Sequence, residues 1–118
     1  MDVFRRTSKQ IATIANGTAL SNMIDLAGYT MVSLKMPAAW TAADLSFEVC
    51  DESNGTFVDL YDETATQVKI ASAQMATLAG KGVSLDTILT YLAPWRFFKL
   101  KSSVAQGADR VFAIVLKA

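Results

Sequence analysis

The sequence predicts an all-β sandwich formed by one domain, and the main observation behind this is periodicity. In several short segments apolar and polar residues alternate with a period of two, as they do in strands that bury one face. These segments follow one another at intervals of roughly 8–12 residues, which is typical of a sandwich. The length of 118 residues suits a single domain, and a chain with 52% hydrophobic and 19% charged residues is too apolar to be disordered.

The last of the expected strands is the most apolar. The expected strands are residues 29–35, 45–49, 56–61, 66–70, 96–101 and 111–117. Residues 111–116 are apolar on both faces, so their strand should be central in its sheet or covered on both sides. Between the second and third strands, Asn54 and Gly55 predict a tight hairpin turn, because both residues tolerate positive φ.

Two stretches stay open between helix and irregular structure. Residues 71–79 are rich in Ala, Gln and Met and show neither a strand alternation nor a good cap. Residues 84–89 could form a short helix, with Ser84 as its N-cap and Pro94 as its stop. The expected domain organisation is an N-terminal arm, residues 1–8, followed by a single β-sandwich domain, residues 9–118.

The composition argues against several classes of function. The chain has no histidine, so the commonest general base and metal ligand is missing, and we expect no enzyme activity, no metal and no cofactor. The single cysteine, Cys50, cannot form an intrachain disulfide. The formal net charge of +0 argues against a nucleic-acid-binding domain, and no apolar run approaches the ~20 residues that a membrane span needs.

The charges are unevenly distributed along the chain. Residues 36–68 hold seven acidic residues and no Lys or Arg, whereas residues 96–118 hold five basic residues and one acid. These segments could be two differently charged faces of a soluble domain. They could also be complementary surfaces that meet in head-to-tail self-association or on a partner. The side chains expected at such a subunit contact are Arg96, Lys99, Lys101, Asp59 and Asp62.

Aromatic residues outside the expected strands offer two further candidate contacts. Trp40 and Trp95 lie near prolines in expected loops, where they could stack on a sugar or close the two ends of the sandwich. In the arm, Phe4, Arg5 and Arg6 have the composition of a docking hot spot, although a disordered start is the alternative.

Several motifs resemble small virion proteins of tailed bacteriophages and prophages. In those proteins a strand ends in a Met-Pro-x-x-Trp-Thr-x-Ala turn and leads into a Leu-Ser/Thr-Phe-x-Val strand. The matching stretch here is residues 26–49, LAGYTMVSLKMPAAWTAADLSFEV. DLYD at residues 59–62, RFFKLKS at 96–102 and QGADR at 106–110 fit the same pattern. The resemblance covers roughly residues 20–117, and residues 71–92 depart from it.

The resemblance implies a structural virion protein rather than an enzyme. Such proteins resemble jelly-roll-like antiparallel β-sandwiches of the capsid decoration (cement) or head-fibre-base type. We therefore expect a homo-oligomer, a dimer or trimer, that is made in the host cytoplasm and binds the major capsid protein on the outer capsid surface. The alternative is a carbohydrate-binding β-sandwich module of a phage fibre or tail, since residues 96–100 also resemble a strand of discoidin-like domains.

Overall fold

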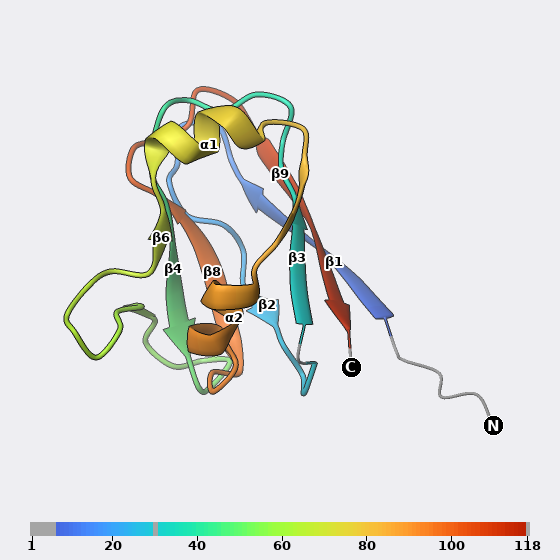
Figure 1. Ribbon diagram of the computed structural model, residues 1–118, viewed down its shortest axis with the longest axis vertical. Helices are drawn as coiled ribbons and strands as arrows, with labels where there is room; N and C mark the ends of the chain where they lie inside the picture. The colour runs from blue at the N-terminus through green and yellow to red at the C-terminus, as the bar shows by residue number, and fades with distance from the viewer. Residues whose placement is uncertain (1–6, 30, 118) are drawn as a thin grey trace.

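Two antiparallel β-sheets packed face to face form the protein (Figure 1), as a computed structural model describes it for residues 7–29 and 31–117. Sheet A has the strand order β1 (Thr7–Ile14), β9 (Arg110–Lys117), β3 (Met31–Lys35), β7 (Gly82–Ser84). Sheet B has the order β2 (Ile24–Asp25), β8 (Phe97–Ser102), β4 (Leu45–Cys50), β5 (Val58–Asp59), and β6 (Lys69–Ile70) also pairs with β4. The predicted all-β sandwich is confirmed.

The strand order is that of a jelly roll once β5 and β6 are treated as one interrupted strand. Asp59 lies opposite Glu48 of β4, and Lys69 lies opposite Ser46, so the two short strands continue along the same edge. Between them, the Leu60 N–H donates to the Phe47 carbonyl at 3.0 Å. Residues 61–68 are therefore an insertion that leaves the sheet and returns to it.

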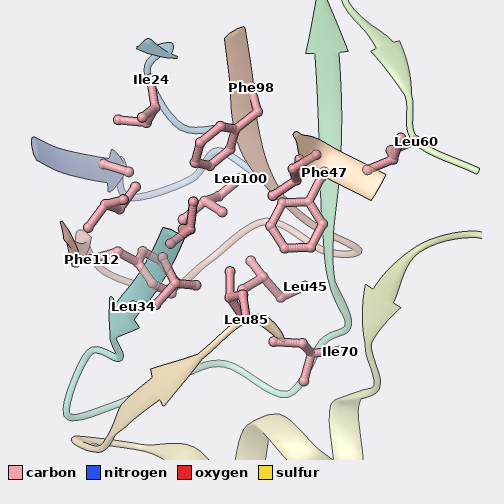
Figure 2. Packing of buried hydrophobic residues seen from close by; sticks show 14 of the residues in the cluster. Ile24, Leu34, Leu45, Phe47, Leu60, Ile70, Leu85, Phe98, Leu100 and Phe112 are labelled. Atoms are coloured by element: carbon pink, nitrogen blue, oxygen red, sulfur yellow. The ribbon is translucent and has the colours of Figure 1, made fainter. Parts of the chain in front are cut away.

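The core lies between the sheets and consists of the inward-facing residues of both (Figure 2). Phe47 of β4 and Phe98 of β8 pack at a ring-centroid distance of 6.3 Å. From the opposite sheet, Leu34 and Phe112 face the same layer. Burying such side chains is the main favourable term in folding a two-layer sandwich.

The last strand is central in its sheet, one of the two predicted alternatives. β9 is central in sheet A, with β1 on one side and β3 on the other. Its inward residues Phe112 and Ile114 are fully buried, but Val111 and Val115 on the other face remain 49% and 38% exposed. The strand is thus central without being covered on both faces.

The predicted Asn-Gly hairpin turn is wrong. Residues 51–57 connect β4 to β5, and neither Asn54 nor Gly55 has a positive φ. The Gly55 N–H instead donates to the Glu52 carbonyl, and the Cys50 thiol donates to the same oxygen at 3.1 Å. A Cβ at position 55 would lie 2.5 Å from the Cys50 sulfur, so glycine is required here by close approach rather than by φ.

Both stretches that the sequence left open contain a helix. Helix α1 (Ser72–Leu78) starts where the Ser72 N–H donates to Asp44 Oδ1 at 2.8 Å, so a carboxylate from a distant segment supplies the missing cap. Helix α2 (Asp86–Leu92) has Leu85 at its N-cap position. The prediction of Ser84 as N-cap is wrong because Ser84 pairs with Ser33 as the last residue of β7.

The strands β1, β2 and β7 are not among the strands expected from the sequence. β1 begins at Thr7, so Thr7 and Ser8, which we expected in the arm, pair with β9. The rest of the predicted arm, with Phe4, Arg5 and Arg6, lies outside the described residues.

A buried glutamine joins three loops at one end of the sandwich. Gln106 is 1% exposed, and its amide exchanges two hydrogen bonds with the Thr41 backbone, at 2.9 and 3.1 Å. The same amide donates to Ser102 Oγ at 2.8 Å and accepts from Arg110 Nε at 3.1 Å. We call Thr41, Ser102, Gln106 and Arg110 the polar clasp. The Gln106 N–H donates to the Thr18 carbonyl, which brings in the loop after β1.

The polar clasp should contribute strongly to stability. Gln106→Leu is expected to lower the free energy of unfolding by about 3 kcal/mol, because it leaves several buried polar groups without partners. Urea denaturation followed by circular dichroism measures this change. The matched control is Gln67→Leu, since the Gln67 side chain makes no hydrogen bond within the described residues. Equal losses for the two variants would contradict the role of the clasp.

Candidate interaction surfaces

The predicted contact residues Lys101 and Asp59 meet within one chain. Lys101 Nζ lies 3.0 Å from Asp59 Oδ1 and 3.4 Å from Glu48 Oε2, on the outer face of sheet B. The hydrogen bond with Asp59, together with Glu48, raises the pKa of the Lys101 ammonium. The acidic and basic segments are therefore not separate faces here, because β4, β5 and β8 bring their charges side by side.

Arg96 and Lys99 are also engaged inside the molecule. Arg96 Nε lies 3.2 Å from Asp25 Oδ1, and its guanidinium carbon lies 5.3 Å from the Phe97 ring centroid. This hydrogen bond with Asp25 raises the pKa of Arg96. Lys99 Nζ lies 4.4 Å above the ring of Phe57, a cation–π contact.

Asp62 organises the turn at the start of the inserted segment. Its Oδ1 accepts from the Thr64 hydroxyl at 2.6 Å and from the backbone N–H groups of Thr64 and Thr66. The Thr64 hydroxyl, followed by the Thr66 N–H, lowers the pKa of the Asp62 carboxyl, so the group stays ionised. Within residues 7–29 and 31–117, no group of three or more His, Cys, Asp or Glu could hold a metal ion.

The two tryptophans lie at opposite ends of the sandwich. Trp40 precedes β4 and Trp95 precedes β8, and these strands are antiparallel neighbours. Trp40 packs edge-on against Phe112 at 5.7 Å, and its Nε1 donates to the Ala43 carbonyl. Trp95 is partly buried against the core cluster. A paired sugar-stacking platform is therefore wrong, and each tryptophan packs at one end of the core.

The outer face of sheet A is a surface that the sequence analysis missed. Its middle is apolar and consists of Ile11, Val111, Ala113 and Val115, with Lys9 and Lys35 at its margin. We call these six residues the apolar–basic face. The strands of sheet A, over the residues that the structure describes, contain no Asp or Glu. In the sequence, the unbroken apolar run at residues 111–116 was the signal for this surface. The same run was also compatible with a strand covered on both faces.

A groove opens between α1, β7 and the start of α2. Its volume is about 580 Å³, and its apolar residues include Ile70, Leu78, Leu85 and Ile88. Polar residues such as Lys69 and Gln74 line the same groove, and none of the predicted contact residues that the structure describes lies in it. No helix of the described part of the chain is long and apolar enough to cross a membrane.

Comparison with known proteins gives a likeness in fold. No family model matches the chain, and no curated protein matches it. Among solved structures, the fold is similar to that of the SPBc2 prophage-derived protein YomS, with a TM-score of 0.64 and 11% sequence identity. The match covers 100% of this chain and 98% of that chain, so the likeness extends over the whole sandwich.

The ion pairs of Lys101 with Asp59 and Glu48 give a prediction about energetic coupling between these side chains. Lys101→Met should lower the free energy of unfolding, because it leaves two carboxylates facing each other. The loss should be less than about 1 kcal/mol, because the ion pair is partly exposed. In an Asp59→Asn background the same substitution should cost less. A double-mutant cycle by urea denaturation measures the difference. Strict additivity of the two changes would contradict the pairing.

Asp44 gives a prediction about pH. The Asp44 carboxylate accepts hydrogen bonds from the Lys69 ammonium and from the Ser72 N–H. Both bonds lower the pKa of Asp44 from the ordinary 3.8, and the bond from Lys69 has the larger effect. A carboxyl group whose pKa is lower in the folded than in the unfolded protein stabilises the fold at pH values above its unfolded pKa. This stabilisation is lost as the pH falls through the folded pKa. Asp44→Asn should therefore lower the Tm at neutral pH, with the difference from wild type vanishing in acid.

The control for Asp44 is Glu63→Gln, which removes one exposed acid with no cation partner among the described residues. Thermal unfolding from neutral pH to about pH 2 separates the two variants, since this range extends below the ordinary carboxyl pKa toward the lowered pKa of Asp44. A Tm difference for Asp44→Asn that persists in acid would contradict the electrostatic cap.

Proposed function

We propose that this chain is a structural protein of a tailed-bacteriophage virion, of the capsid decoration (cement) type. The observation that carries the proposal is the whole-chain likeness to a prophage-derived protein with the same sandwich. In this proposal the protein is made in the host cytoplasm and binds the major capsid protein on the outer capsid surface.

The motifs that resemble phage virion proteins support the proposal because they meet in the structure. Thr41 belongs to the Met-Pro-x-x-Trp-Thr motif, and Gln106 and Arg110 belong to the QGADR motif. These residues hydrogen-bond one another in the polar clasp, at distances of 2.9–3.1 Å. The motifs thus specify a rigid loop end of the sandwich rather than a reactive group.

The surfaces suit a protein that works by contact. Exposed Ile11, Val111 and Val115 give the outer face of sheet A an apolar area that water does not favour. A decoration protein occupies many equivalent positions on a lattice, so modest contacts of this kind add up through repetition. In this proposal no substrate is bound.

The alternative function, a carbohydrate-binding module of a phage fibre or tail, has less support. Sugar stacking needs exposed aromatic faces, and two such faces acting together must lie on one side. Trp40 is held by its ring contact with Phe112, and Trp95 lies at the other end of the sandwich.

Electron microscopy of particles tests the proposed function. We expect density for this chain in regular positions on the head of wild-type particles, and its loss from particles of a phage in which the coding sequence is deleted. The deleted particles should also release DNA at a lower temperature, since lattice contacts are lost. Density confined to the tail, or no density on the virion, would rule out the decoration role.

A further inference from the structure

We propose that copies of this chain associate head to tail, with the apolar–basic face of one copy on an acidic edge of the next. The acidic edge is the exposed surface around β5 and the start of the inserted segment. It consists of the exposed residues Asp51, Glu52, Val58, Tyr61 and Glu63, together with the half-buried Asp62. This inference concerns self-association and does not depend on the virion role.

The first of the two surfaces combines exposed apolar side chains with charge of one sign. Ile11 is 47% exposed and Val111 is 49% exposed, although both lie in the middle of paired strands. Lys9 and Lys35 are exposed at the margin, and neither has an ion pair within residues 7–29 and 31–117. A surface of this character fits an acidic surface that has an apolar centre.

The second surface has that complementary character. Val58 and Tyr61 are 52% and 53% exposed, and each is followed in the chain by an aspartate. Other acids of the same sequence segment are neutralised by lysines, Asp59 by Lys101 and Asp44 by Lys69. Within the described residues, Asp51, Glu52 and Glu63 have no such cation.

The two surfaces cannot satisfy each other within one molecule. The inserted segment after β5 projects on the left in Figure 1, whereas β1, β9 and β3 lie on the right. A two-fold contact between two apolar–basic faces would bring lysines toward lysines and leave the acidic edge uncovered. A head-to-tail contact pairs opposite charges and covers both apolar areas, and it forms a ring if its rotation closes.

Charge reversal tests the contact in the full chain. Sedimentation equilibrium at low salt should show an increase in the dissociation constant of about tenfold or more for Lys9→Glu/Lys35→Glu, because the two introduced glutamates repel the acidic edge. Glu52→Lys/Glu63→Lys should have the same effect. The chain with all four substitutions has the wild-type net charge and should associate again.

Mixing gives a signature specific to a head-to-tail contact. Neither double variant should associate with itself. In an equimolar mixture, the basic face of Glu52→Lys/Glu63→Lys can bind the acidic edge of Lys9→Glu/Lys35→Glu, as in wild type. The acidic face of Lys9→Glu/Lys35→Glu can likewise bind the basic edge of the other variant. The mixture should therefore associate. The apolar part is tested by Ile11→Thr/Val115→Thr, which keeps β-branched residues in both strands and should weaken association even at high salt.

The control variant adds charge away from both surfaces. Gln74→Glu/Thr87→Glu places two acids on the helices, where a glutamate at position 74 can still accept from the Ala71 N–H. This variant should associate like wild type, and circular dichroism checks that every variant is folded.

Three results would overturn the inference. One is a wild-type protein that stays monomeric up to about 1 mM, a concentration that would detect even a very weak contact. Another is unchanged or stronger association of Lys9→Glu/Lys35→Glu, which would show that the two lysines do not face the acidic edge. The third is failure of both the mixture and the four-substitution chain to associate. None of these results depends on where the protein lies on a virion.

Discussion

The fold depends on the requirement that a buried amide find all its hydrogen-bond partners. Gln106 is almost fully buried between loops, and an unpaired amide there would cost more than most single contacts return. Its partners come from the connection after β3, the end of β8 and the start of β9. The jelly-roll order places these ends together, and the amide then holds the loops at one spacing. This constraint keeps one end of both sheets fixed while the core fills the space between them.

The jelly-roll order also explains why the acidic and basic segments of the sequence do not become two oppositely charged faces. The acidic segment contributes β4 and β5, and the basic segment contributes β8, which pairs directly with β4. Glu48 lies opposite Lys99, and Lys101 reaches both Glu48 and Asp59. Antiparallel pairing thus neutralises part of the segment charge inside the molecule, since Glu48 and Asp59 share Lys101. Among the described residues, the charges that remain without an ion pair include Lys9 and Lys35 on sheet A and the acids around β5.

The sandwich and its central strands could be predicted from the sequence because one-face burial leaves a period of two. β1 escaped because its inward positions include the polar Ser8 and Gln10, so its alternation is not one of apolar and polar residues. The Asn-Gly turn failed because residues 51–57 form a longer connection, in which the Gly55 N–H bonds the Glu52 carbonyl. The candidate surfaces were harder still. Which charges pair, and which apolar residues stay uncovered, depend on contacts between residues far apart in the chain, such as Lys101 with Asp59 and Thr41 with Gln106.

Sheet edges are the usual alternative to faces as contact sites, and in this protein they are poorly suited to strand addition. The outer edge of β4 is covered by β5 and β6. On the long edge strand β1, the Asn22 side chain accepts from the Thr13 N–H and donates to the Ile11 carbonyl, so it occupies two of the backbone positions that an added strand would use. The strands β2, β5 and β7 have only two or three residues each, too few for a stable pairing. Faces and loops are therefore better suited to contacts than the sheet edges, and exposed apolar area coincides with unpaired charge on the outer face of sheet A and around β5.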